Sequence, residues 1–207
     1  MRVIYGIYLR SGPFCIVSIY TPGPNTVMVM SSGLNFGARK TIPLMGGICI
    51  GFTAMVFLVG VGFSSIFSTY PELHFFIKCV GVVYLLYLAY LIASSNDSVK
   101  DKKQSKPLSF VQGALFQWVN VKAWVVATGA VAAFTNGAEE FFVQILALTA
   151  IFFLVSFPSV AVWLLFGVLL KKLLGSPKTR KWFNMGMATL LALSVVPMVT
   201  EILREVA

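Results

Sequence analysis

Charged side chains are scarce in this sequence. Only 11% of the 207 residues are Asp, Glu, Lys or Arg, whereas about a quarter of the residues of a soluble globular domain are charged. In their place, 58% of the residues are hydrophobic and the mean hydropathy is +0.87. A chain of this composition has too little polar surface to cover a core in water. We therefore exclude a soluble domain and expect an integral membrane protein.

Histidine, cysteine and acidic side chains are also few. His74 is the single histidine, and Cys15, Cys49 and Cys79 lie far apart in the first half of the chain. This pattern predicts no metal site and no cofactor. It also argues against a membrane-embedded thiol–disulfide electron carrier, which needs paired cysteines, although that class stays open as an alternative. No His, Asp or Glu is expected inside a span, so the groups for acid/base catalysis are missing and we do not expect an enzyme.

Long hydrophobic runs make up most of the chain. Each is long enough to cross a hydrocarbon core of about 30 Å as a helix rising about 1.5 Å per residue, and none alternates as barrel strands do. We predict an all-α membrane protein with six transmembrane helices at residues 11–34, 41–67, 73–93, 110–134, 141–170 and 182–203. We expect residues 1–207 to form a single transmembrane domain, in which a polar cytoplasmic linker at 96–108 separates the three-helix halves 1–95 and 109–207.

The basic residues are concentrated on one side of this predicted topology. Most of the 16 Lys and Arg residues fall in the connections after the first, third and fifth spans. By the positive-inside rule these connections are cytoplasmic, and both termini lie outside the cytoplasm. The net charge of +9 then reflects topology and contact with anionic membrane lipid, so a nucleic-acid partner is not expected.

The first predicted span is interrupted by the sequence TPGPN at residues 21–25. Pro22 and Pro24 have no amide hydrogen, so a continuous helix would leave the carbonyls of Ser18 and Tyr20 without partners. Such a break in hydrocarbon is tolerated where protein or a watery cavity meets it. We expect a new helix to begin at Pro24 with unpaired amides at its positive end, which suits a carboxylate. A proline kink that only shapes packing is the alternative interpretation.

A second interruption, QWVNVK, opens the second half at residues 117–122. Because each half has an odd number of spans, a duplication would place the halves upside down relative to each other, as in carriers built from inverted repeats. Asn25 and Asn120 are the natural pair in that arrangement. Lys122 lies near the middle of the fourth span, where a lipid-facing charge costs about 2.5–3.5 kcal/mol. It is expected either to bind a solute or to hold the fourth span to the first by donating to carbonyls that the prolines free.

Two further features are interpreted as packing devices. Gly47 and Gly51 form a GxxxG pattern, which lets membrane helices approach closely and is compatible with a homodimer. Pro158 is interpreted as a helix kink that Ser156 and Ser159 help to accommodate.

The interrupted stretches resemble a known family. TPGPN, followed by FGARKTIPLMGGICIGF, GVVYLLYLAYLIASS and SFVQGALFQWVNVKAW, is similar over nearly the whole chain to the LysE/RhtB family of bacterial amino-acid exporters. Much of that family has Asn-Pro-Lys where this chain has Asn120, Val121 and Lys122, and the form Gln-x-x-Asn-Val-Lys resembles the cysteine/O-acetylserine efflux branch. The resemblance implies secondary export of small neutral amino acids or derivatives, cysteine/O-acetylserine-like or threonine/homoserine-like, across the cell (inner) membrane.

The predicted binding site combines both interruptions. A zwitterionic amino acid would place its carboxylate against the amides after Pro24 and the ammonium of Lys122, and its amino group against freed carbonyls and side-chain oxygens. The residues expected to bind the substrate are Thr21, Pro22, Gly23, Pro24, Asn25, Gln117, Asn120 and Lys122. A solute channel lined by the same residues is an alternative that the sequence leaves open.

Overall fold

The structure, a computed structural model, describes residues 2–62, 69, 71–95, 106–135, 140–174 and 176–206. Every regular element within these ranges is an α-helix, which confirms the all-α class. The helices are α1 (Arg2–Tyr20), α2 (Pro24–Phe36), α3 (Ala38–Gly60), α5 (Pro71–Ala93), α6 (Phe110–Val119), α7 (Val121–Phe134), α8 (Phe141–Leu173), α9 (Pro177–Leu193) and α10 (Val196–Val206).

Within the described ranges, four helical stretches are long and apolar enough to cross a membrane. They are Ala38–Gly60, Phe75–Ala93, Phe141–Leu173 and Pro177–Arg204, and they correspond to the second, third, fifth and sixth predicted spans. The second ends earlier than predicted, at Gly60, and residues 63–68 lie outside the described ranges, as does most of the predicted linker at 96–108. The first and fourth predicted spans are each divided into two shorter helices, α1 with α2 and α6 with α7.

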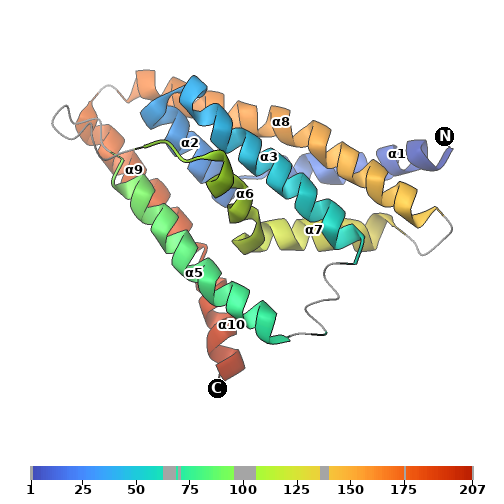
Figure 1. Ribbon diagram of the computed structural model, residues 1–207. Helices are drawn as coiled ribbons and strands as arrows, with labels where there is room; N and C mark the ends of the chain where they lie inside the picture. The colour runs from blue at the N-terminus through green and yellow to red at the C-terminus, as the bar shows by residue number, and fades with distance from the viewer. Residues whose placement is uncertain are drawn as a thin grey trace.

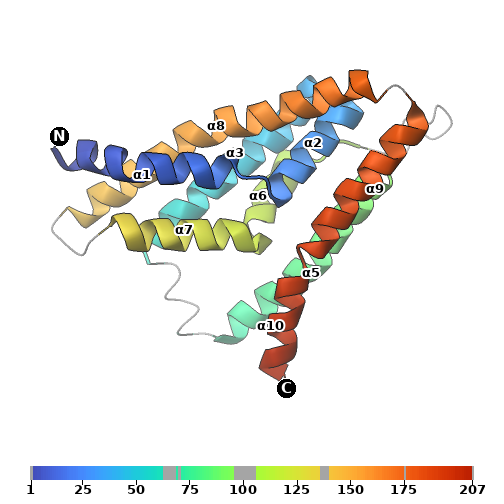
Figure 2. The same ribbon diagram turned by 180° about the vertical axis from the view of Figure 1, so that it is seen from behind.

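The longest helix, α8, packs along α1, α2 and α3 (Figure 1). On the other side of α3, α6 and α7 complete a bundle. Helices α5 and α9 pack side by side and diverge from this bundle, and α10 continues beyond the end of α9 (Figure 2). Both helix breaks, between α1 and α2 and between α6 and α7, lie near the middle of the molecule, where the α5–α9 pair meets the bundle.

Glycines set the closest helix crossings. A Cβ atom on Gly51 of α3 would lie 2.7 Å from Ala114 Cα of α6, and one on Gly113 of α6 would lie 2.7 Å from the Leu44 carbonyl oxygen of α3. Gly33 of α2 has the same role against α8. The packing interpretation of the GxxxG pattern is therefore confirmed, but its partner is α6 of the same chain. This face is consequently not available to a second copy.

One acidic residue lies within a long apolar stretch, contrary to the sequence expectation. Glu201 belongs to the stretch Pro177–Arg204, and its Oε2 is 3.2 Å from Nζ of Lys78 on α5. The Lys78 side chain is only 10% exposed, whereas that of Glu201 is 57% exposed. The pair ties α10 to α5, so the carboxylate has a structural partner.

A second polar contact ties α9 to α2. The side-chain amides of Asn184 and Asn35 donate to each other's carbonyl oxygens at 2.9 Å. The Asn184 amide also donates to the Ser95 carbonyl at 2.6 Å, and the Ser31 hydroxyl donates to Asn184 Oδ1 at 3.2 Å. Because both side-chain polar atoms of the buried Asn184 are paired, this cluster acts as scaffold.

We predict that Gly51→Ala lowers the free energy of unfolding by about 1–3 kcal/mol, because the added methyl group forces α3 and α6 apart. The measurement is the thermal melting temperature of the protein in detergent. Gly129→Ala on α7 is the matched control, since a Cβ there would have nothing within 4 Å. A helical Gly→Ala change without a clash should leave stability equal or slightly raised. Equal melting temperatures for both variants would contradict the close crossing.

Candidate binding site at the two helix breaks

The first break occurs where the prolines predict it. Helix α1 ends at Tyr20 and α2 begins at Pro24, with Gly23 as its N-cap residue and no side-chain cap. The Gly23 backbone is extended, with φ −169° and ψ −170°, so its conformation alone does not require glycine. With Pro24 in the first position, the first-turn amides of Asn25 and Thr26 have no partner within the helix. They form a positive helix end in the interior of the protein.

The second break is centred on Asn120. This residue is both the C-cap of α6 and the N-cap of α7, with an extended backbone, and its side chain does not cap α7. Its carbonyl accepts hydrogen bonds from the amides of Ala123 and Trp124. The Trp124 indole donates to the Trp118 carbonyl at 2.9 Å, which pairs one of the last carbonyls of α6. Helix α7 therefore also begins without a side-chain cap.

The two breaks are joined by side chains. Asn25 Nδ2 donates to Gln117 Oε1 at 3.0 Å, and Gln117 Nε2 donates to Asn25 Oδ1 at 2.9 Å and to the Gly113 carbonyl at 3.0 Å. Gln117 is completely buried. Since each amide already satisfies the other, this pair fixes α2 to α6 and leaves little capacity for a ligand.

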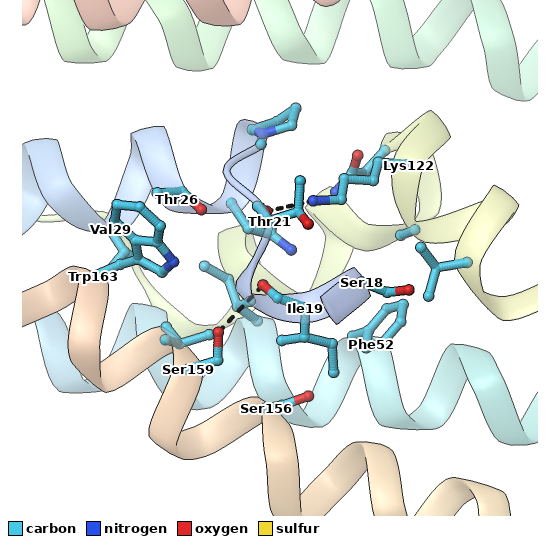
Figure 3. A pocket seen from close by; sticks show the side chains of 18 residues that line it. Ser18, Ile19, Thr21, Thr26, Val29, Phe52, Lys122, Ser156, Ser159 and Trp163 are labelled. Atoms are coloured by element: carbon cyan, nitrogen blue, oxygen red, sulfur yellow. Dashed lines mark hydrogen bonds between the residues drawn. The ribbon is translucent and has the colours of Figure 1, made fainter. Parts of the chain in front are cut away.

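Lys122 makes the second connection. Its Nζ donates to the Thr21 carbonyl (Figure 3). It also lies 3.5 Å from the Pro22 carbonyl oxygen. Its aliphatic part covers Gly23, because a Cβ on Gly23 would lie 3.0 Å from Lys122 Cδ. Glycine at position 23 therefore lets the lysine side chain lie close against the backbone, and a larger residue would shift it. The expectation that Lys122 holds the two broken spans together by donating to backbone carbonyls agrees with this contact.

The carbonyls that receive donors differ from those expected. Proline chemistry predicts free carbonyls at Ser18 and Tyr20, whereas the contacts reach Thr21 and Ile19. The Ile19 carbonyl accepts a hydrogen bond from the Ser159 hydroxyl of α8 at 3.2 Å (Figure 3). The reason is that α1 stops at Tyr20, so the Ile19 carbonyl also loses its amide donor, in addition to the carbonyls four positions before each proline.

A cavity of about 60 Å³ lies between the two breaks and helices α3 and α8. We call it the break cavity. It has room for a few water molecules or a small solute. Three buried polar atoms without a hydrogen-bond partner belong to residues that line it, namely Asn120 Oδ1, Ser156 Oγ and Trp163 Nε1. A buried polar atom left unpaired costs about 1–3 kcal/mol, so this arrangement calls for water or a polar ligand in the cavity.

The electrostatics of the break cavity favour a bound anionic group. The N-terminal ends of α2 and α7 and the Lys122 ammonium are positive, and they share one cavity wall. The end of α1, at Ser18 and Ile19, adds the negative pole of a helix C-terminus. No Asp or Glu is among the lining residues. The cavity thus offers sites for a carboxylate and an ammonium close together, but no counter-charge for a further cation.

Most of the predicted site residues meet here. Thr21, Gly23, Pro24, Asn25, Asn120 and Lys122 line the break cavity, whereas Pro22 and Gln117 do not. The sequence interpretation missed Ser156 and Trp163 and assigned Ser156 and Ser159 to a proline kink. Nothing local to α8 shows that these side chains face a break located some 140 residues earlier in the chain. In the described part of the chain, no three His, Cys, Asp or Glu side chains are grouped to hold a metal ion.

Comparison with known proteins gives a family match. Residues 16–201 match the family model described as LysE type translocator. The chain is 30% identical over 122 residues to the cysteine/O-acetylserine efflux proteins of Escherichia coli (strain K12) and Shigella sonnei (strain Ss046). These matches cover 58% of this chain and 62% of each relative, so less than two thirds of the relatives' length is spanned. No solved structure matches the chain.

We predict that Asn25→Ala and Gln117→Ala each lower the free energy of unfolding by about 1–3 kcal/mol, because the first leaves the buried Gln117 amide and the second the partly buried Asn25 amide without its partner. The double variant should cost clearly less than the sum, since no amide of the pair then remains. Thermal melting in detergent measures the cycle. Thr128→Ala is the control, because that exposed hydroxyl bonds only to backbone within its own helix. Additive losses would contradict the pairing.

Proposed function

The chain belongs to the LysE type translocator family, and from this premise we propose that it is a secondary transporter that exports small neutral amino acids or their derivatives. The observation that carries the proposal is the break cavity, in which two uncapped helix N-termini, a lysine and three unpaired polar atoms meet. The cysteine/O-acetylserine efflux activity named for the relatives supports this substrate class. Export crosses the cell (inner) membrane.

A zwitterionic amino acid fits the charges of the break cavity. Its carboxylate accepts hydrogen bonds from the first-turn amides of Asn25 and Thr26 and faces the start of α7. Its ammonium lies toward the carbonyl end of α1, with Asn120 Oδ1 as a further acceptor. Asn25 and Gln117 then act by positioning the break, because their amides are bonded to each other.

The substrate is small and carries no extra positive charge. The cavity volume of about 60 Å³ suits an amino acid with a short side chain, and the lining residues offer Ser156 and Trp163 as hydrogen-bond partners for a thiol, hydroxyl or ester oxygen. A lysine-like or arginine-like side chain would find no carboxylate there and would meet the charge of Lys122. Cysteine, O-acetylserine, threonine and homoserine satisfy these limits.

The proposed arrangement in the membrane is based on the helix breaks and on the packing of the helices. We propose six crossings in two inverted repeats, one made of α1–α2, α3 and α5 and the other of α6–α7, α8 and α9. The contacts support this: the broken helix of each repeat packs on the second helix of the other, α3 packs on α8, and α5 packs on α9. The basic connections at Arg39 and Lys172 are then cytoplasmic, and both termini lie outside.

Two alternatives remain distinguishable. A channel would use the same cavity without alternating exposure, and a thiol–disulfide carrier would use cysteine chemistry. Cys15, Cys49 and Cys79 are free thiols in the structure, and none of them lines the break cavity. The unpaired polar atoms of the lining residues favour solute binding over electron transfer.

Transport itself is tested in inside-out membrane vesicles with labelled cysteine, O-acetylserine, threonine and homoserine. We expect saturable uptake and counterflow for at least one of them, whereas linear uptake without counterflow would indicate a channel. Pro24→Ala should lower the rate at least about tenfold, because alanine restores an amide donor for the Tyr20 carbonyl and so changes the break between α1 and α2. Normal transport by Pro24→Ala at a normal protein level would refute the site.

Substitutions of two serines on α8 distinguish an effect on substrate binding from an effect on stability. Ser156→Ala removes a hydroxyl that has no protein partner, so stability should be unchanged while the KM for export rises about two- to tenfold, the equivalent of one hydrogen bond. Ser159→Ala unpairs the Ile19 carbonyl and should lower the melting temperature.

Thr149→Val, which removes an unpaired hydroxyl away from the break cavity, should change neither quantity. The readouts are initial export rates at varied substrate concentration and thermal melting in detergent. A normal KM together with lost stability in Ser156→Ala would mean that this hydroxyl is structural.

A further inference from the structure

A second cavity lies against the first. Its volume is about 210 Å³, and it is lined by Leu85 of α5, by Ser194 after α9 and by Met198 of α10. It shares Pro24, Asn120 and Lys122 with the break cavity. The other residues of the second cavity come from α5, from the adjoining ends of α6 and α7, and from Ser194 and α10, whereas those of the break cavity come from α1, α2, α3, α7 and α8. The three shared residues therefore lie between the two cavities and form a partition.

Lys122 is the mobile part of this partition. Proline and the buried Asn120 are fixed by backbone and packing, whereas a lysine side chain has four rotatable carbons and carries its charge at the tip. Its ammonium rests on the Thr21 and Pro22 carbonyls, and its aliphatic part crosses Gly23 at contact distance. These carbonyls belong to the negative end of the α1 break, the place that suits a substrate's amino group.

We propose that Lys122 is an internal substitute for the amino group of the substrate. In the empty protein its ammonium pairs with the Thr21 and Pro22 carbonyls and closes the partition between the cavities. An arriving amino acid places its own ammonium on these carbonyls and displaces the lysine, which then pairs with the substrate carboxylate. This inference rests on the proposed export function and assigns Lys122 two successive partners.

The exchange keeps every charged group paired. Leaving the break carbonyls without a donor is costly wherever water does not reach them, and moving Lys122 without an anion would leave a partly buried charge uncompensated. A zwitterion supplies an ammonium for the carbonyls and a carboxylate for the lysine at the same time. A solute that has only one of these groups leaves either the carbonyls or Lys122 without a partner, so the partition selects for amino acids.

The test compares cysteine with its two halves, cysteamine, which lacks the carboxylate, and 3-mercaptopropionate, which lacks the amino group. Each competes against labelled cysteine in counterflow with reconstituted protein, for the wild type and for Lys122→Met. In the wild type both halves should inhibit weakly. In Lys122→Met, cysteamine should inhibit at least about tenfold better, because its competitor for the carbonyls is gone, whereas 3-mercaptopropionate should inhibit no better than before.

Other outcomes overturn the inference. If Lys122→Met binds cysteine more weakly than the wild type but cysteamine inhibits both equally, Lys122 only binds the carboxylate. If all three probes act on Lys122→Met as they act on the wild type, Lys122 only holds the helices together. If Lys122→Met no longer transports, shifts of the melting temperature of the purified protein by the same three probes give the same comparison. Lys40→Met, at an exposed position at the start of α3, is the control and should match the wild type.

The proposed function fails separately from this inference. Absence of any counterflow by wild-type protein with cysteine, O-acetylserine, threonine or homoserine would refute export. A different result refutes only the inference about Lys122: wild-type counterflow is normal, but cysteamine inhibits Lys122→Met no better than it inhibits the wild type.

Discussion

The structure depends on one constraint: backbone polar groups away from water must find partners. Pro22 and Pro24 make this impossible within one continuous helix, because two amide donors are missing in the first interrupted stretch. The chain meets the constraint with side chains from three other helices. Ser159 of α8 pairs the Ile19 carbonyl, Lys122 of α7 pairs the Thr21 carbonyl, and Gln117 of α6 holds Asn25 at the start of α2. The break is therefore one of the places at which the two halves of the chain are joined.

Some buried polar side chains have all their hydrogen-bond partners within the protein, and others do not. This difference distinguishes residues of the scaffold from residues of the candidate binding site. Gln117 and Asn184 are buried, and their side-chain polar atoms have hydrogen-bond partners within the protein. Asn120, Ser156 and Trp163 each present a buried atom that has none, and all three line the break cavity. Since unpaired buried polar atoms are rare in native proteins, three around one cavity indicate that the missing partners are supplied from outside the chain.

Local chemistry made the central features predictable. The missing amides of proline fix the break at residues 21–25, the hydrophobic runs fix the long helices, and the cost of a charge in hydrocarbon places Lys122 against the break. The α8 side chains were not predictable, because Ser156 and Trp163 reach the cavity through a tertiary contact with residues far away in sequence. The role of Gln117 was predicted as ligand binding, yet its partner is Asn25. A single sequence shows that a buried amide needs a partner, but it does not show which one.

The contacts around the break also differ in how readily a solute can replace them. At the glycine crossings of α3 with α6 and of α2 with α8, backbone atoms are in direct contact, and close packing of this kind has one geometry. The Asn25–Gln117 pair exchanges two neutral hydrogen bonds that no amino acid reproduces in the same shape. The Lys122 contact is different, because an ammonium on two carbonyls can be replaced by another ammonium at little cost. The proposed transport needs a rigid frame and one exchangeable contact, and the Lys122 contact at the end of the broken helix meets the second need.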